Sequence, residues 1–324
     1  MKKTIAILIS FILVFGLIST SGVPASAEGG RLRIVTTIFP EYDWVMNLLG
    51  SRAAEAEVTM LLDNGVDLHS YQPTVDDIVR ISTCDLFIYV GGESDAWVDS
   101  ALAEASNKDM LVIDLLDVLG DAVKEEELVE GMEAEEEDED AEEEGPEYDE
   151  HVWLSLKNAA VLCGAISEAL ARIDPVNAEA YRANAAVYTE RLAALDAEYQ
   201  AAVDAASVKT LLFGDRFPFR YLADDYGLSY YAAFVGCSAE TEASFSTIVF
   251  LADKVDQLGL NAICQIESSD GAIARTIQEN TRSRDQAVLT FDSMQSTTSR
   301  QVADGADYLA IMAQNLDVLK AALR

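Results

Sequence analysis

The stretch Arg33-Ile34-Val35-Thr36-Thr37 begins the pattern that decides the fold class of this chain. It is a short apolar run of strand length, and a stretch with amphipathic helical spacing follows it at 42–49. Further apolar runs lie at 57–62, 86–90 and 110–113, with helical stretches between them at 75–81 and 96–105. Because strands and helices alternate, the first half predicts an α/β fold with a parallel sheet.

The same alternation returns in the second half, after a long helical region. Residues 156–173 predict one helix, and Asp174-Pro175 predicts the start of another that continues to about residue 206. Strands are expected at 210–213, 229–234, 262–266 and 287–290, followed by a helix over 299–323. We therefore expect two lobes, each with a four-stranded, mostly parallel sheet flanked by helices, joined by one long rigid helix. The expected boundaries are 28–173, 174–206 and 207–324 for the N-terminal lobe, the connecting helix and the C-terminal lobe.

The first 27 residues have the features of a secretory signal peptide. Lys2 and Lys3 precede an apolar stretch over 5–18, and Ala25-Ser26-Ala27 resembles a cleavage site. That stretch is shorter than the roughly 20 apolar residues of a membrane-spanning helix. We expect an exported, extracytoplasmic protein, at the cell surface or in the periplasm. No cysteine lies near the expected cleavage site, so no lipid anchor is expected there.

The chain is strongly acidic, with a formal net charge of −35. Loss of Lys2 and Lys3 with the signal peptide would change this charge to −37, which argues against binding to nucleic acid or anionic lipid. Between positions 125 and 150, 17 of the 26 residues are acidic. This block predicts a disordered, solvated loop over 121–148. It is either a solvated surface or, through the acidic run 133–144, a weak collector of cations.

The chain contains only two histidines, His69 and His151, and both lie beside carboxylates in expected loops. A single histidine is more often a structural, hydrogen-bonded residue than a ligand. Two histidines in such surroundings favour a metal site, because imidazole is the commonest side-chain ligand of transition metals. His69, Asp215 and Asp292 all follow expected strands, at the sheet edge where ligands bind in open parallel sheets.

Four cysteines in an exported chain can form disulfides. Cys84 and Cys163 lie inside apolar stretches and are expected to be buried thiols. Cys237 and Cys264 flank two strands that we expect to be neighbours, so they are the favoured disulfide pair. The chain has no CxxC pair, which argues against a thiolate metal site or a redox motif.

Several segments in order give the chain a resemblance to a known family. They are Val35-Thr36-Thr37-Ile38-Phe39-Pro40, Gly65-Val66-Asp67-Leu68-His69-Ser70-Tyr71-Gln72-Pro73-Thr74, Asp85-Leu86-Phe87-Ile88-Tyr89-Val90-Gly91, Glu150-His151-Val152-Trp153-Leu154, Tyr221-Leu222-Ala223 with Tyr226-Gly227-Leu228, and Phe291-Asp292-Ser293. With these segments the chain resembles the zinc- and manganese-binding receptors of bacterial ABC importers, the cluster A-I solute-binding proteins. The resemblance covers essentially the whole mature chain.

The resemblance implies a divalent ion held between the two lobes. It implies that His69, His151 and Asp292 are ligands. Family members place the remaining ligand, His or Glu, shortly before a Phe-x-Tyr segment, and strict spacing puts Arg216 there. A guanidinium is always protonated and has no free lone pair to donate to a metal. Asp215 is therefore the predicted ligand, with Glu240, Glu242 and Glu267 as alternatives.

The implied function is capture of zinc, or less favourably manganese, by a monomeric receptor that delivers the ion to an ABC permease. The receptor is not expected to be an enzyme. Two other functions are weighed against it. A metal-dependent hydrolase would need an open zinc position, but the chain has no HExxH helix and no Ser-His-Asp arrangement. A surface adhesin or cation buffer would act through the acidic loop.

Overall fold

The computed structural model describes residues 31–133, 147–238 and 242–324. The expected signal peptide, much of the acidic loop and Glu240 therefore lie outside the described residues. From Leu32 to Arg324 the chain forms one compact unit. Among the described residues, none of the helices combines the length and the apolar character needed to cross a membrane.

The first sheet contains four parallel strands in the order β2-β1-β3-β4. The strands are β1 (Leu32–Thr36), β2 (Ala56–Met60), β3 (Leu86–Tyr89) and β4 (Leu111–Asp114). The helices along this part of the chain are α1 (Phe39–Leu49), η1 (Gly50–Glu55), η2 (Leu68–Ser70), α2 (Val75–Thr83), α3 (Val98–Ala103), α4 (Leu115–Leu119) and η3 (Gly120–Ala122). The central strands bury Ile34, Phe87 and Ile88 completely, as expected for a parallel sheet covered on both faces.

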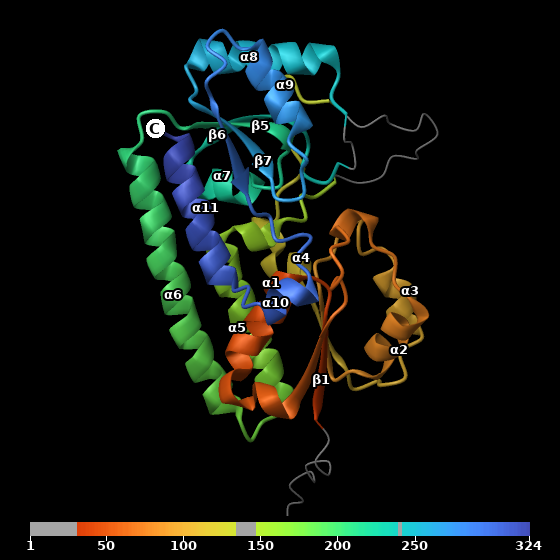
Figure 1. The fold of residues 1–324 in the computed structure, drawn as a ribbon. Helices are drawn as coiled ribbons and strands as arrows, with labels where there is room; N and C mark the ends of the chain where they lie inside the picture. Colours follow the sequence, from red (N-terminus) through yellow and green to blue (C-terminus); the bar gives the residue numbers. More distant parts are fainter. Residues whose placement is uncertain (1–30, 134–146, 239–241) are drawn as a thin grey trace, which may run out of the picture. The chain divides into compact units, whose positions relative to one another are not determined.

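The second sheet repeats this arrangement in the order β6-β5-β7-β8, again with parallel strands. Figure 1 labels β5, β6 and β7 in this sheet. Its strands are β5 (Thr210–Arg216), β6 (Ser229–Phe234), β7 (Ala262–Ile266) and β8 (Ala287–Phe291). The accompanying helices are α7 (Arg220–Tyr226), α8 (Phe245–Leu258), α9 (Ala272–Asn280), α10 (Ser299–Ala303) and α11 (Tyr308–Ala322). The two sheets confirm the predicted fold class.

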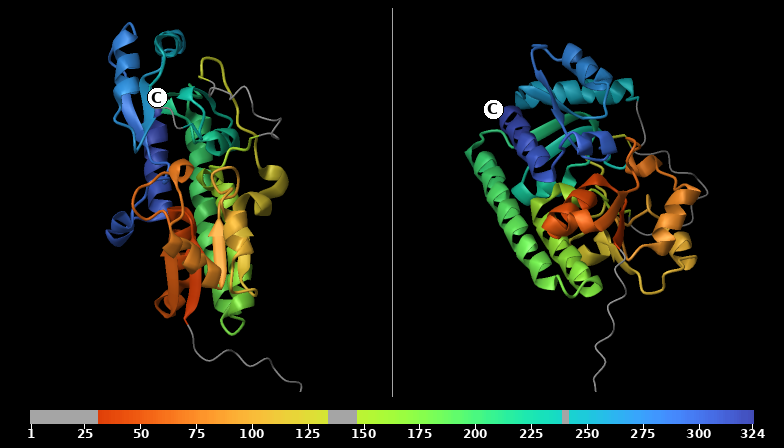
Figure 2. Two further views of the ribbon diagram at one scale, coloured as in Figure 1. Left: turned by 90° about the vertical axis from the view of Figure 1, so that its right-hand side faces the viewer. Right: turned by 60° about the horizontal axis from the view of Figure 1, so that its bottom comes forward.

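A pair of long helices lies between the two sheets in the sequence: α5 (Leu156–Ile173) and α6 (Ala178–Ala205). They run side by side, as Figure 2 shows from two further directions. Helix α6 also contacts α1 and α11, and it is tied to both by hydrogen bonds: Asn184 Nδ2 donates to Leu48 O (2.9 Å) and Tyr199 OH donates to Met312 O (2.6 Å). Helix α6 thus connects α1, which precedes it in the sequence, with α11, which follows it.

Two predicted helix boundaries are wrong. Helix α6 begins at Ala178, after the turn 174–177, because Asp174 accepts hydrogen bonds from Asn177 Nδ2 (2.6 Å) and Tyr181 OH (2.6 Å). The helix expected over 299–323 is divided into α10 and α11. Gly305 separates them with φ 100°, and Asp307 caps α11 by accepting from Ala310 N. The lobe boundaries themselves stay a prediction.

The described part of the acidic segment differs from the solvated loop that was expected. The backbone of Glu125 forms an isolated antiparallel β-bridge with Tyr148, and that of Glu133 forms a parallel β-bridge with Phe234 at the end of β6. Two carboxylates form ion pairs with the second half of the chain, Glu127 with Arg220 and Glu130 with Lys254. Basic partners therefore hold residues 125–133 in place, which their sequence alone did not indicate.

All four cysteines are free thiols. Cys84 and Cys163 are buried, as predicted. The predicted disulfide between Cys237 and Cys264 is wrong. Cys264 lies within β7 and Cys237 follows β6, and β5 lies between these two strands. The error came from treating strands that follow each other in sequence as neighbours in the sheet.

Candidate metal centre

His69 lies in the short helix η2 that follows β2, and its imidazole is almost buried, with 7% of the side chain exposed. Asp67 caps this helix by accepting a hydrogen bond from the His69 backbone N–H (3.1 Å). The ring is oriented by Ser94, whose Oγ lies 2.8 Å from His69 Nδ1. This contact leaves Nε2 as the nitrogen that faces His151.

His151 lies just before the 3-10 helix η4 (Val152–Leu154) and is completely buried. One oxygen of Asp149, Oδ1, lies 2.9 Å from the His151 backbone N and 3.0 Å from His151 Nδ1. A carboxylate at Nδ1 fixes the tautomer with the proton on that nitrogen and leaves the lone pair on Nε2. This contact leaves His151 Nε2 available as a donor atom for a metal ion.

The two Nε2 atoms lie 3.2 Å apart. Zinc–nitrogen bonds of 2.0–2.1 Å at tetrahedral angles place two nitrogen ligands about 3.3 Å apart. Burial, the proximity of His151 and the charge of Arg216 lower the pKa of His69 to about 3, against the opposing effect of Asp67. The His69 imidazole is therefore neutral near pH 7, as a metal ligand must be.

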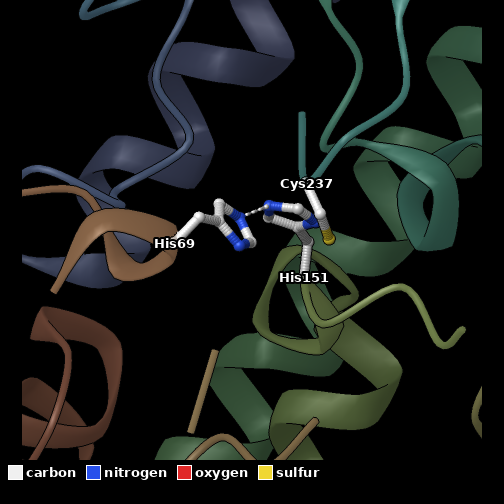
Figure 3. Close-up of side chains that lie close together, drawn as sticks. All are labelled: His69, His151 and Cys237. Atoms are coloured by element: carbon white, nitrogen blue, oxygen red, sulfur yellow. Dashed lines mark hydrogen bonds between the residues drawn. The ribbon is translucent and has the colours of Figure 1, made fainter. Parts of the chain in front are cut away.

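Cys237 brings a third donor atom to the two histidines. Within the described residues, one donor atom from each of His69, His151 and Cys237 lies within 4.8 Å of the other two. The three side chains converge from separate segments of the chain (Figure 3). Burial, followed by the charge of Asp149, raises the pKa of the Cys237 thiol, so a metal ion is needed to hold it as a thiolate.

The glycine before this cysteine allows the close approach. A Cβ atom on Gly236 would lie 3.1 Å from His151 Nδ1 and 3.0 Å from the Phe217 carbonyl oxygen, closer than about nine in ten Cβ contacts. The loop after β6 can therefore pass directly against the His151 ring because residue 236 has no side chain.

Asp215 does not join this group. Its Oδ1 accepts a hydrogen bond from Arg216 N (2.9 Å) and its Oδ2 accepts one from Ile266 N (3.2 Å), so both oxygens bind the backbone. The Arg216 guanidinium instead forms an ion pair with Asp67 and donates through Nη1 to Ser238 O (3.2 Å). Arg216 thus connects the turn that carries His69 to the loop that carries Cys237.

Asp292 lies just after β8 and is also outside the group of three, among the described residues. Its Oδ1 accepts from Met294 N (2.8 Å), and Asn315 holds its backbone through two hydrogen bonds (2.8 and 2.9 Å). Burial raises the pKa of Asp292, and burial together with Asp292 raises that of Glu267. Glu267 accepts from Ser293 N (2.7 Å), while Glu242 is exposed.

The sequence did not lead us to expect Cys237 in this group, for two reasons. The absence of a CxxC pair was taken to exclude sulfur ligands, and the residue was assigned to a disulfide. The available signal was its position, because Cys237 directly follows a predicted strand, as His69, Asp215 and Asp292 do. In a parallel sheet such positions gather at one edge.

An acidic cleft of about 220 Å³ opens beside two of the three donor residues, His69 and Cys237. His69, Ser94, Cys237 and Tyr148 line it together with four glutamates, Glu93, Glu126, Glu147 and Glu150. Glu150 is buried, and its Oε2 lies 3.5 Å from His69 Nδ1. Carboxylates around a concave path raise the local concentration of cations, so this cleft suits the entry of a positively charged ion.

Comparison with known proteins gives consistent matches. The family model described as "Zinc-uptake complex component A periplasmic" matches residues 34–322. The zinc-binding protein AdcA of Streptococcus pyogenes serotype M6 is 28% identical over an aligned length of 325, which covers 99% of this chain. This chain spans 61% of the length of that relative.

A second relative is of similar length to this chain. The high-affinity zinc uptake system protein ZnuA of Bacillus subtilis strain 168 is 29% identical over 308 residues, which cover 94% of this chain and 91% of the relative. Among solved structures, the Zn(II)-bound ZnuA-like domain of Streptococcus pneumoniae AdcA has a TM-score of 0.70 and 28% identity. That match covers 91% of this chain and 99% of the domain.

Proposed function

Since this chain belongs to the family of periplasmic zinc-uptake components, we propose that it captures a divalent transition metal ion outside the cytoplasm and delivers it to an ABC permease. Zinc is the proposed cargo and manganese is the alternative. The protein acts as a monomeric receptor and not as an enzyme. The relatives whose names describe zinc binding and zinc uptake support this proposal.

The observation that carries the proposal is the 3.2 Å separation of His69 Nε2 and His151 Nε2 in a buried site. Both imidazoles are oriented from the Nδ1 side, by Ser94 and Asp149 respectively. In the metal-free protein a proton on one of these nitrogens forms a hydrogen bond between them, and a metal ion would take the place of that proton. A metal ion bound to both nitrogens satisfies them at little cost in rearrangement, because the rings are already positioned.

The proposed ligands come from both halves of the chain. His69 and His151 precede α6, whereas Asp292, the predicted carboxylate ligand, follows it. Asp215 is the weaker candidate, because both of its oxygens accept backbone hydrogen bonds. Binding of one ion to donors from both halves favours the conformation in which these donors meet. Helix α6 contacts both halves, so we expect this rearrangement to be small.

Zinc is favoured over manganese by the nitrogen donors, because manganese prefers oxygen ligands. Affinity alone does not identify the cargo, since the Irving–Williams order favours zinc at almost any such site. The metal content of the protein purified from cells without added metal distinguishes the two. We expect zinc at about one ion per chain.

A competition titration against a chromophoric zinc chelator tests the proposal. We expect the wild type to bind one zinc ion tightly, and His69→Ala and His151→Ala each to lose this binding. Thr189→Ala is a matched control, because Thr189 bonds only carbonyl oxygens of its own helix and should leave affinity unchanged. Unchanged affinity in both histidine variants would overturn the proposal.

Two further measurements separate the alternatives. Replacing the acidic residues of 135–144 with serine should leave the tight zinc ion in place. A cation buffer would instead lose its binding in this variant and keep it in the histidine variants. A hydrolase would leave a water on the metal and turn over ester or peptide substrates, whereas the receptor should show no turnover that depends on zinc.

A further inference from the structure

We propose that Cys237 is a ligand of the captured ion and binds it as a thiolate. This inference rests on the proposed function, because it assigns another donor of the same metal centre. Cys237 gives the second half of the chain a sulfur ligand, where the sequence predicted the Asp215 carboxylate.

The distances already approach those of a metal site. In tetrahedral zinc sites, bonds of about 2.0–2.1 Å to nitrogen and 2.3 Å to sulfur place a nitrogen and a sulfur ligand about 3.6 Å apart. The donor atoms of His69, His151 and Cys237 all lie within 4.8 Å of one another. The loop that carries Cys237 must therefore move toward the two Nε2 atoms to complete the geometry. The Nε2 atoms of the two histidines need almost no change.

The loop that carries Cys237 is held on both sides of the sulfur. The Cys237 backbone N donates to Glu126 Oε1 (3.1 Å), and the carbonyl oxygen of Ser238 accepts from Arg216 Nη1 (3.2 Å). On the preceding side, Gly236 packs against the His151 ring, where a Cβ atom would be 3.1 Å from Nδ1. These three contacts come from separate segments, and together they position Cys237 beside His151.

The other three cysteines do not have this environment. Cys84 donates through its thiol to Ile81 O (3.2 Å), and Cys163 and Cys264 are buried in the hydrophobic core. Cys237 alone among the four is only partly buried, and it lines the acidic cleft with His69. An ion that enters this cleft therefore reaches the sulfur and an imidazole in the same place.

Binding replaces the S–H bond of Cys237 with a metal–sulfur bond and releases the proton to solvent. No oxidation occurs in this step. A thiolate is a softer donor than a carboxylate, and soft donors favour zinc over manganese. Cys237 thus adds to the zinc preference that the two imidazole nitrogens already give this centre.

Cobalt(II) is the probe for the first test, because it occupies zinc sites and its thiolate complexes absorb in the near ultraviolet. We expect the cobalt-loaded wild type to show this sulfur-to-cobalt band, and Cys237→Ser to lose it. Cys163→Ala is the matched control and should keep the band. His69→Ala should lose cobalt binding itself.

Zinc affinity and alkylation provide independent readouts. Loss of an outer-shell partner costs 10–100-fold in metal affinity, so Cys237→Ser should weaken zinc binding by about 100-fold or more and manganese binding far less. Iodoacetamide should alkylate Cys237 slowly in the metal-free wild type, because burial disfavours the thiolate that reacts, and one equivalent of zinc should slow this reaction further. In His151→Ala the same zinc concentration should give no protection.

The outcomes separate the two proposals. If the wild type binds zinc tightly but Cys237→Ser keeps the sulfur band and the zinc-to-manganese preference, Cys237 is not a ligand and the proposed function stands. If neither the wild type nor Cys163→Ala binds zinc or cobalt, the proposed function itself is overturned.

Discussion

Asp149 is expected to set the affinity of the metal centre without touching the ion. Its Oδ1 lies 3.0 Å from His151 Nδ1 and 2.9 Å from the His151 backbone N, and its side chain is 3% exposed. Asp149→Asn keeps an oxygen acceptor for both hydrogen bonds and removes the negative charge. The effect of Asp149→Asn on zinc affinity therefore measures the contribution of the negative charge alone, because the shape of the side chain is kept.

The magnitude follows from the strength of these bonds. A hydrogen bond to a charged group contributes about 1.5–3 kcal/mol and a neutral one about 0.5–1.5 kcal/mol. The loss of charge should therefore cost about 1.4 kcal/mol, which is a tenfold weaker zinc affinity. Asp149→Ala also removes the orientation of the ring and should cost about 100-fold, the upper end for such partners.

Competition with a chromophoric chelator measures both variants. Asp174→Asn is the control, because Asp174 also accepts two side-chain hydrogen bonds but lies in the turn between α5 and α6. Its zinc affinity should equal that of the wild type. Wild-type affinity in Asp149→Ala would show that His151 is not oriented for metal by this carboxylate, and the account of the site would fail.

Three other predictions concern the loop, the ion pair and the core. Gly236→Ala should weaken zinc binding about tenfold in the same titration, because its Cβ atom would force the loop away from His151 Nδ1, now 3.1 Å from that position; wild-type affinity would refute this. Arg216→Ala should remove the ion-pair partner of Asp67 and loosen both the turn that carries His69 and the loop that carries Cys237. Amide hydrogen exchange should therefore become faster at 67–70 and 236–238. Unchanged exchange rates would show that Arg216 does not connect the turn to the loop. Burial, followed by the charge of Asp307, raises the pKa of Asp43 from 3.8 to about 7. Its ionisation therefore destabilises the fold progressively between these pH values, with no penalty below 3.8 and the full one above 7. Asp43→Asn should raise the free energy of unfolding at pH 8 by up to about 4 kcal/mol, at 1.36 kcal/mol per pKa unit, and should change it little at pH 4. Urea denaturation at both pH values measures this difference. Equal effects of the substitution at the two pH values would contradict the prediction.

The sheets could be predicted because their strands are short apolar runs separated by amphipathic helices. The interval 229–234 was predicted with the bounds of β6, and 262–266 with those of β7. The order of strands in a sheet is not encoded in this periodicity. For that reason the sequence suggested a Cys237–Cys264 disulfide, although β5 lies between the two strands that carry them.

The candidate site could be predicted only in part, for a similar reason. His69 and His151 are noticeable because histidine is rare in this chain, and the structure brings their Nε2 atoms to 3.2 Å. A cysteine without a CxxC partner has no such local signal. Its proximity to His151 depends on the path of the loop after β6, and this path depends on contacts with Glu126 and Arg216, which lie far away in the sequence.

Anomalous diffraction at the zinc edge, on crystals of protein purified without added metal, tests the central claim most directly. We expect one zinc ion per chain, with Nε2 of His69 and of His151 at about 2.0–2.1 Å and the Cys237 sulfur at about 2.3 Å. Zinc bound only to surface carboxylates, with both imidazoles outside bonding distance, would contradict the account.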